Sequence, residues 1–86
     1  MSDSNQSTLS QKQIDSLINL FSNGQFDEVL NSLKALIKLH PEVSLLHNIN
    51  GACYAGLGQL ASAIKSYENA ISLDPGYAKA HFNLGN

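Results

Sequence analysis

Few residues of this chain could carry out chemistry, and they lie apart from one another. The chain has three histidines and a single cysteine, Cys53. A zinc or catalytic role for His47 and His81 would require a carboxylate or thiol partner at short spacing, and neither histidine has one. The two lie 34 residues apart, which favours a repeated packing role. His40 precedes Pro41 and is expected to cap a helix end.

The other reactive side chains also have a simple structural interpretation. Cys53 follows Ala52 on the apolar side of its segment and has no neighbouring base, so we expect a buried thiol rather than a nucleophile. Asp27 and Glu28 begin a helical segment, where carboxylates stabilise the helix dipole. The glycines around Leu57 lack the preceding strand and the Gly-Lys-Ser ending of a phosphate loop. The sequence therefore predicts a protein that is not an enzyme, with no metal and no cofactor.

Composition narrows the class further. The chain has 86 residues, enough for one small domain, and 14% of them are charged, against about 25% in a typical domain. All five basic residues are lysines and the net charge is −2, which argues against a nucleic-acid partner. No apolar run approaches the ~18 residues of a membrane span. We expect a soluble protein of a reducing, cytoplasmic compartment.

Local signals divide the chain into helices. Residues 1–9 are polar and are expected to form a disordered leader. Ser10 and Gln13 have the spacing of a capping box, and Asn23-Gly24 ends the helix that follows. Apolar residues at spacings of three and four predict further helices. These are Phe26–Leu39, Ser44–Gly56, Leu60–Leu73 and one that opens at Ala78.

An internal repeat is the strongest signal in the sequence. A shift of 34 residues superimposes residues of the same or similar type. The pairs are Gly24 with Gly58, Phe26 with Leu60, Leu39 with Leu73, Pro41 with Pro75, His47 with His81, and Gly51 with Gly85. Six matches at one offset indicate a tandem array of helix pairs.

This pattern resembles the tetratricopeptide repeat. The residues that carry the resemblance in the middle unit are His47, Asn50-Gly51, Tyr54, Ala63, Tyr67, Ala70 and Pro75. In the first unit Leu17 stands where the small residue belongs, so that unit is degenerate. The resemblance implies an all-α, right-handed superhelical array of antiparallel helix pairs. Its units are expected at 10–43 and 44–77, with 78–86 as the first-helix fragment of a third.

The resemblance also implies a function. The first helices of such units line a concave face that binds a peptide segment of a partner protein. The expected lining residues are Gln11, Ile14, Asp15, Ile18, Ser22, Leu45, Asn48, Ile49, Ala52, Ala55, Lys79, Phe82 and Asn83. Ile14 and Ile18 replace the Lys and Asn that clamp a carboxylate in some family members. This surface is apolar and rich in amides, so binding is expected to depend weakly on salt.

The C-terminal end of the array has no capping helix in this sequence. We expect a fragment of a longer array that forms a homo-oligomer through this end, by stacking or by exchange of the last helix. The residues expected there are Tyr67, Ile71, Ala78, Phe82 and Leu84. Two alternatives stay open: the N-terminal arm of a larger enzyme, such as a glycosyltransferase or sulfotransferase, and a module whose function is self-assembly.

Overall fold

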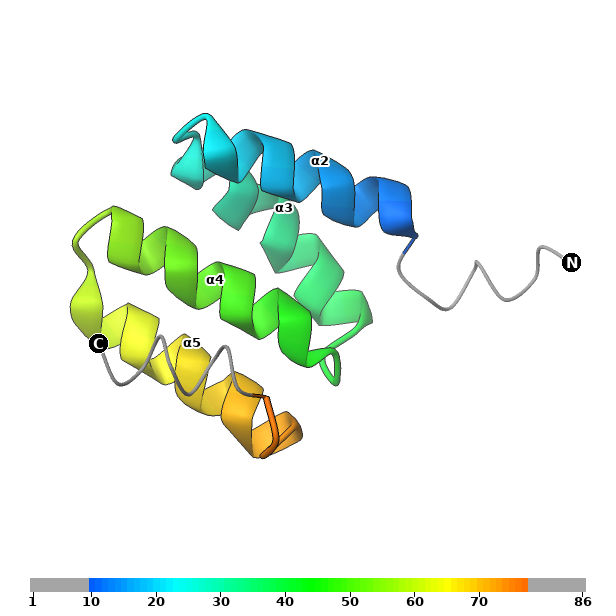
Figure 1. Cartoon of the computed structure of the whole chain (residues 1–86), viewed down its shortest axis with the longest axis vertical. Helices are drawn as coiled ribbons and strands as arrows, with labels where there is room; N and C mark the ends of the chain where they lie inside the picture. Colours follow the sequence, from blue (N-terminus) through cyan, green and yellow to red (C-terminus); the bar gives the residue numbers. More distant parts are fainter. Residues whose placement is uncertain (1–9, 78–86) are drawn as a thin grey trace, which may run out of the picture.

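A computed structural model describes residues 10–77, which form four α-helices and no strand. The helices are α2 (Gln11–Ser22), α3 (Phe26–Leu39), α4 (Ser44–Gly56) and α5 (Leu60–Leu73) (Figure 1). They begin and end at the residues expected from the sequence, and the all-α fold class is confirmed. The expected leader, 1–9, and the expected third-unit fragment, 78–86, lie outside the described residues.

Short-range interactions set the helix ends. The Ser10 hydroxyl accepts a hydrogen bond from the Gln13 backbone N–H at 3.1 Å, and the Gln13 side chain accepts one from the Ser10 N–H at 3.0 Å. This is the predicted capping box, which satisfies N–H groups that the first turn leaves free. Gly24 and Gly58 have φ of 78° and 80° in the tight turns after α2 and α4, a conformation that glycine adopts without steric cost.

The helices pack in chain order, with α4 against both α3 and α5 (Figure 1). One core cluster joins α2, α3 and α4. Its fully buried members are Val29 and Leu33 of α3 and Leu46 and Cys53 of α4, and Leu17 of α2 joins them at 3% exposure. The first helix of the second expected pair therefore shares a core with the first pair, as neighbouring units of a helical repeat array do.

The pair α4–α5 is in more extensive contact than the pair α2–α3. The reason lies at Gly51, where an added Cβ would come within 2.7 Å of two atoms of the Tyr67 ring. The missing side chain lets the ring of α5 lie directly on the α4 backbone. Leu17 occupies the corresponding place in α2, and its bulk keeps α3 from the same close approach.

None of the helices between residues 10 and 77 has the length and apolar character needed to cross a membrane.

Candidate functional site

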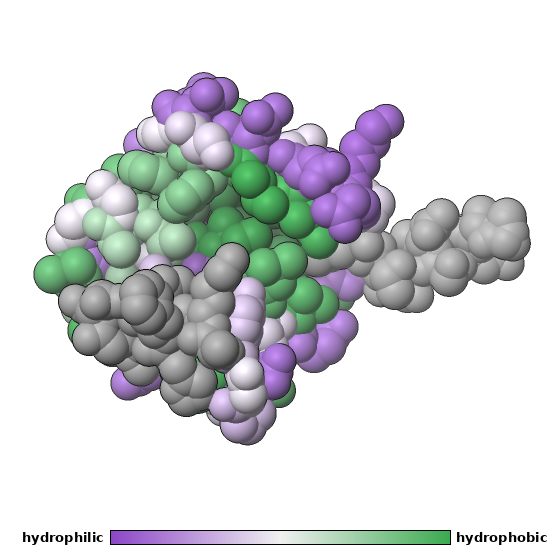
Figure 2. Space-filling model, in the orientation of Figure 1, coloured by the Kyte–Doolittle hydropathy of each residue, from purple (hydrophilic) through white to green (hydrophobic). Residues whose placement is uncertain are grey.

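A groove opens between α2 and α4 and is floored by α5. We call it the α2–α4 groove. Its volume is about 450 Å³, within the range of small-molecule and side-chain pockets. Figure 2 shows apolar side chains gathered over α4 and the facing edge of α2, with polar side chains along the outer edge of α2. The lining residues are Ile18, Phe21, Leu45, Asn48, Ile49, Ala52 and Tyr67.

Packing fixes the floor of the groove and its α2 side. Ile49 and Tyr67 are only 9% and 6% exposed, so they form a fixed floor. Phe21 packs against Phe26 with ring centroids 5.2 Å apart, which fixes the α2 side. Ile18 is 49% exposed at the rim. A partner would therefore meet a preformed apolar floor and one exposed apolar side chain at the edge.

The groove has little charge. Among residues 10–77, those that line it include neither a carboxylate nor an amine. Burial raises the pKa of the Tyr67 phenol, and the nearby Cys53 raises it further, so Tyr67 stays neutral at physiological pH. The Asn48 side chain, 6% exposed, hydrogen-bonds the side chain of Tyr77. The described lining of the groove therefore offers a partner apolar contact rather than ion pairing.

The structure brings together part of the expected concave face. Five of the expected residues line the groove: Ile18, Leu45, Asn48, Ile49 and Ala52. Five others of the described region do not: Gln11, Ile14, Asp15, Ser22 and Ala55. Among these, the Gln11 side-chain amide donates to the Asp15 carboxylate at 3.0 Å on the exposed face of α2. The expected Lys79, Phe82 and Asn83 lie outside the described residues.

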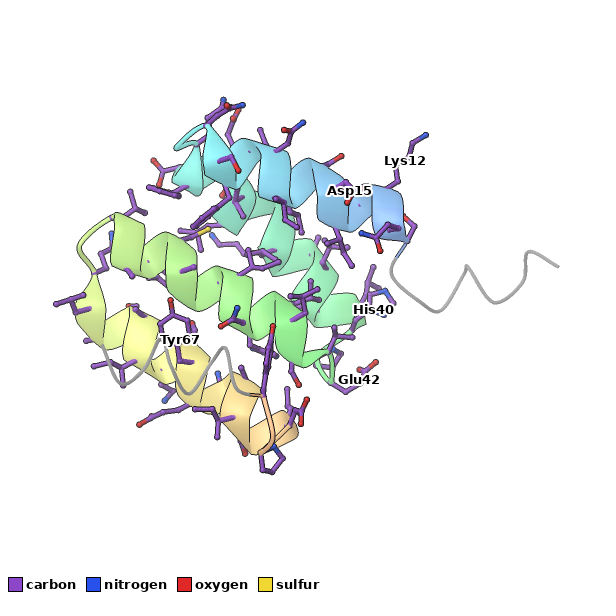
Figure 3. All side chains as sticks on the ribbon, in the orientation of Figure 1. Lys12, Asp15, His40, Glu42 and Tyr67 are labelled. Carbon is purple, nitrogen blue, oxygen red and sulfur yellow. The ribbon has the colours of Figure 1, made fainter. Side chains whose placement is uncertain are left out.

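Two groove residues were not expected there. Phe21 continues the apolar spacing of Ile14, Leu17 and Ile18, and this spacing could have placed it beside them. Tyr67 was expected at the self-association end, yet it rises from α5 against α4 and floors the groove (Figure 3). Only the close approach at Gly51 brings α5 near enough for Tyr67 to reach this place.

Of the other residues expected at the self-association end, the structure describes only Ile71. Ile71 is half-buried on α5. Ala78, Phe82 and Leu84 lie outside the described residues. Self-association through this end stays a prediction.

A second hollow, of about 420 Å³, lies between α4 and α5 and is lined mainly by residues with polar side chains. None of the expected site residues lines it. Its members are Asn50, Tyr54, Ala61, Ser62, Lys65, Ser66 and Asn69. The Asn50 amide donates to the Ser66 hydroxyl at 2.8 Å, so the hollow is braced by an internal hydrogen bond.

Two residues with reactive side chains, His47 and Cys53, are held by contacts within the array. The Nε2 atom of His47 lies 2.9 Å from the Pro41 carbonyl oxygen and ties α4 to the loop before it. Cys53 is fully buried, and burial raises the pKa of its thiol from 9.0 to about 11. Within residues 10–77, no group of three or more His, Cys, Asp or Glu side chains could hold a metal ion.

Comparison with known proteins adds a family and several relatives. Residues 51–86 match the family model for the TPR repeat. The chain is 31% identical over 64 residues to the peroxisomal targeting signal receptor of Candida glabrata. That alignment covers 74% of this chain and 11% of the receptor. It is 37% identical over 59 residues to ethylene-overproduction protein 1 of Arabidopsis thaliana, and this alignment covers 69% of this chain and 6% of the relative.

A third relative is the Hsp70-Hsp90 organizing protein of Triticum aestivum, 26% identical over 66 residues, covering 77% of this chain and 11% of the relative. The chain thus spans between 6% and 11% of the length of these relatives. No solved structure matches it significantly.

Proposed function

Because the chain belongs, through residues 51–86, to the TPR repeat family, we propose that it is a protein-interaction module that binds a peptide segment of a partner in the α2–α4 groove. The observation that carries the proposal is the preformed apolar floor of Ile49 and Tyr67 beneath an opening of about 450 Å³. A floor that is already ordered loses little conformational entropy when a peptide binds.

The chemistry of the groove specifies the segment it would take. Apolar walls gain free energy from covering apolar surface, at about 25 cal/mol per Å². A charged side chain placed against Ile49 and Tyr67 would lose its hydration and find no counter-ion among the lining residues that the structure describes. The peptide is therefore anchored by an aliphatic or aromatic side chain rather than by a carboxylate or ammonium group.

Two relatives support this class of function by their names. One is a receptor for a targeting signal and another organises Hsp70 and Hsp90. Both names describe proteins that engage other proteins, and for this chain we carry over that general role only. We infer a non-enzymatic module, with a repeat unit at 10–43 and another at 44–77. The buried free thiol of Cys53 agrees with a reducing, cytoplasmic location.

A binding selection tests the proposal. A displayed library of random peptides is selected against the whole chain, and the dissociation constant of a selected peptide is measured by fluorescence anisotropy. Ile18→Asp places a charge at the rim, where half-exposure limits the effect on folding. We expect binding to weaken at least about tenfold. Leu39→Asp is the matched control, since Leu39 is 73% exposed on α3 and does not line the groove.

Salt provides a second readout. For wild type we expect the dissociation constant to change less than about twofold from roughly 0.01 M to roughly 1 M salt, although screening strengthens greatly over that range. A steep loss of affinity with salt, or equal binding by Ile18→Asp and wild type, would overturn the proposal.

A further inference from the structure

The hollow between α4 and α5 is separate from the α2–α4 groove. None of the described residues lines both. On α4 the hollow is lined by Asn50 and Tyr54, and Asn50 lies two residues from both Asn48 and Ala52 of the groove. Residues two apart on a helix of 3.6 residues per turn point to opposite sides. The hollow and the groove therefore open on opposite sides of α4.

The innermost part of the hollow is held by a hydrogen bond between the two helices. Ser66 of α5 is 4% exposed, and its hydroxyl accepts a hydrogen bond from the side-chain amide of Asn50 at 2.8 Å. Polar side chains that bond one another in this way keep a fixed direction. A ligand would therefore meet a hollow that is already ordered, and binding would cost little conformational entropy.

The hollow combines hydrogen-bond donors from both helices with one positive charge. Tyr54 supplies a hydroxyl from α4. On α5, Ser62, Lys65 and Asn69 supply a hydroxyl, an ammonium group and an amide. Lys65 is exposed, and it carries the only charge among the lining residues that the structure describes. This set of groups favours an anion with several oxygen atoms, since hydrogen bonds to charged groups are the stronger ones.

The first helix pair has the opposite charge at the same register. The residues that lie 34 positions before the lining of the hollow include Asp27 and Glu28 and no basic residue. Glu28 stands where Ser62 is, and Asn31 stands where Lys65 is. The same helix-pair packing therefore forms with two carboxylates or with one ammonium group at these places. The positive charge of the hollow is thus not a requirement of the fold.

The size of the hollow and the placement of its donors favour phosphate over carboxylate. A carboxylate has two oxygens in one plane, whereas a phosphate monoester has three oxygens in different directions and a charge of about −1.5 to −2 at pH 7. The donors stand on two helices around a volume of about 420 Å³. We propose that this hollow binds a phosphate monoester group, with Lys65 as its charge partner and the hydroxyls of Tyr54 and Ser62 as donors.

The test is a titration of the isotope-labelled whole chain followed by nitrogen–proton correlation NMR. The probes are acetylated, amidated phosphoserine and glycerol phosphate, and acetylated, amidated aspartate is the carboxylate control. We expect the phosphate probes to shift amide signals of the hollow with a dissociation constant of about 1 mM. Aspartate should bind at least about threefold more weakly, because it carries about half the charge.

The two phosphate probes distinguish the sources of this group. Tighter binding of phosphoserine supports a phosphorylated protein as the source, and tighter binding of glycerol phosphate supports a small metabolite. Binding of neither probe, or equal binding of aspartate, would overturn the proposal. Affinity should fall as salt rises from roughly 0.01 M to roughly 0.15 M, because Lys65 is exposed and open to screening.

Variants locate the site. Lys65→Gln is expected to weaken phosphate binding by about fivefold, the upper end for an exposed ion pair. Lys38→Gln is the matched control, since Lys38 is exposed on α3 and does not line the hollow. Ser62→Glu introduces the residue that α3 carries at the same register, so the fold should persist and phosphate binding should be lost. Equal binding by Lys65→Gln and wild type would refute the assignment, because phosphate would then be attracted to lysines in general.

Discussion

Gly51→Ala should destabilise this protein even though alanine is the better helix former. In α4 the new Cβ would stand 2.7 Å from the Cδ1 and Cε1 atoms of Tyr67, and ordinary contact begins near 3.4 Å. The ring must therefore move by about 0.7 Å relative to α4. Tyr67 is 6% exposed, so it has no open space into which to swing.

The magnitude follows from two opposing terms. Overpacking a well-filled core costs about 1–3 kcal/mol, and we expect the upper half of that range because the obstacle is a rigid, buried ring. Replacing glycine by alanine inside a helix returns about 1 kcal/mol. The net loss is about 1–2 kcal/mol, which lowers the Tm of a domain of this size by about 4–16 °C.

Urea unfolding followed by circular dichroism measures the loss. Ala55→Gly, at an exposed position of the same helix, measures the free-energy difference between alanine and glycine in this helix where no contact with Tyr67 is involved. Combining Gly51→Ala with Tyr67→Leu closes a double-mutant cycle. In the Tyr67→Leu background the alanine should be neutral or stabilising, because the flexible leucine can move aside. If Gly51→Ala alone is as stable as wild type, or costs the same in both backgrounds, the close approach at Gly51 does not govern α4–α5 packing.

Three further predictions follow from other parts of the molecule. Burial raises the pKa of the Cys53 thiol from 9.0 to about 11. The stability that this thiol contributes is therefore complete below about pH 9 and is lost as the pH rises toward about 11. The urea concentration at the midpoint of unfolding should fall across this pH range, and it should fall less for Cys53→Ala. Gly58→Ala forces a side chain into φ of 80° with nothing nearby to clash, which should cost about 1–2 kcal/mol by backbone strain alone, read from the same unfolding curves. The triple variant Lys12→Leu, Asp15→Ile and Asn19→Cys gives exposed polar positions of α2 the apolar residues found 34 positions later in α4, and it should produce association that rises with concentration in sedimentation velocity; a monomer at all concentrations would contradict this expectation.

The helix boundaries could be predicted because their causes are local. The Ser10–Gln13 capping box, the glycine turns at Gly24 and Gly58, and the proline after His40 act within a few residues of one another. The structure places all four described helices at the expected residues. The 34-residue offset also predicted two successive helix pairs, of which the first would be degenerate because Leu17 stands where the second has Gly51.

The groove was predictable only in part. Spacing along α4 placed Leu45, Asn48, Ile49 and Ala52 on one helix face, because a helix face is a property of one segment, and these four residues line the groove. It gave no means of choosing between Ile18, which lines the groove, and Ile14, which does not. That choice depends on the angle and distance at which α2 meets α4.

The sequence by itself determined where each helix begins and ends, that the helices repeat in pairs, and that Cys53 would be a buried side chain rather than a reactive one. Tertiary structure alone decided that Tyr67 floors the groove. Its place depends on a distance between two helices that Gly51 permits and Leu17 does not. Contacts between helices depend on the sizes of side chains that lie far apart in the chain. The apolar spacing within one helix does not determine how closely another helix packs against it.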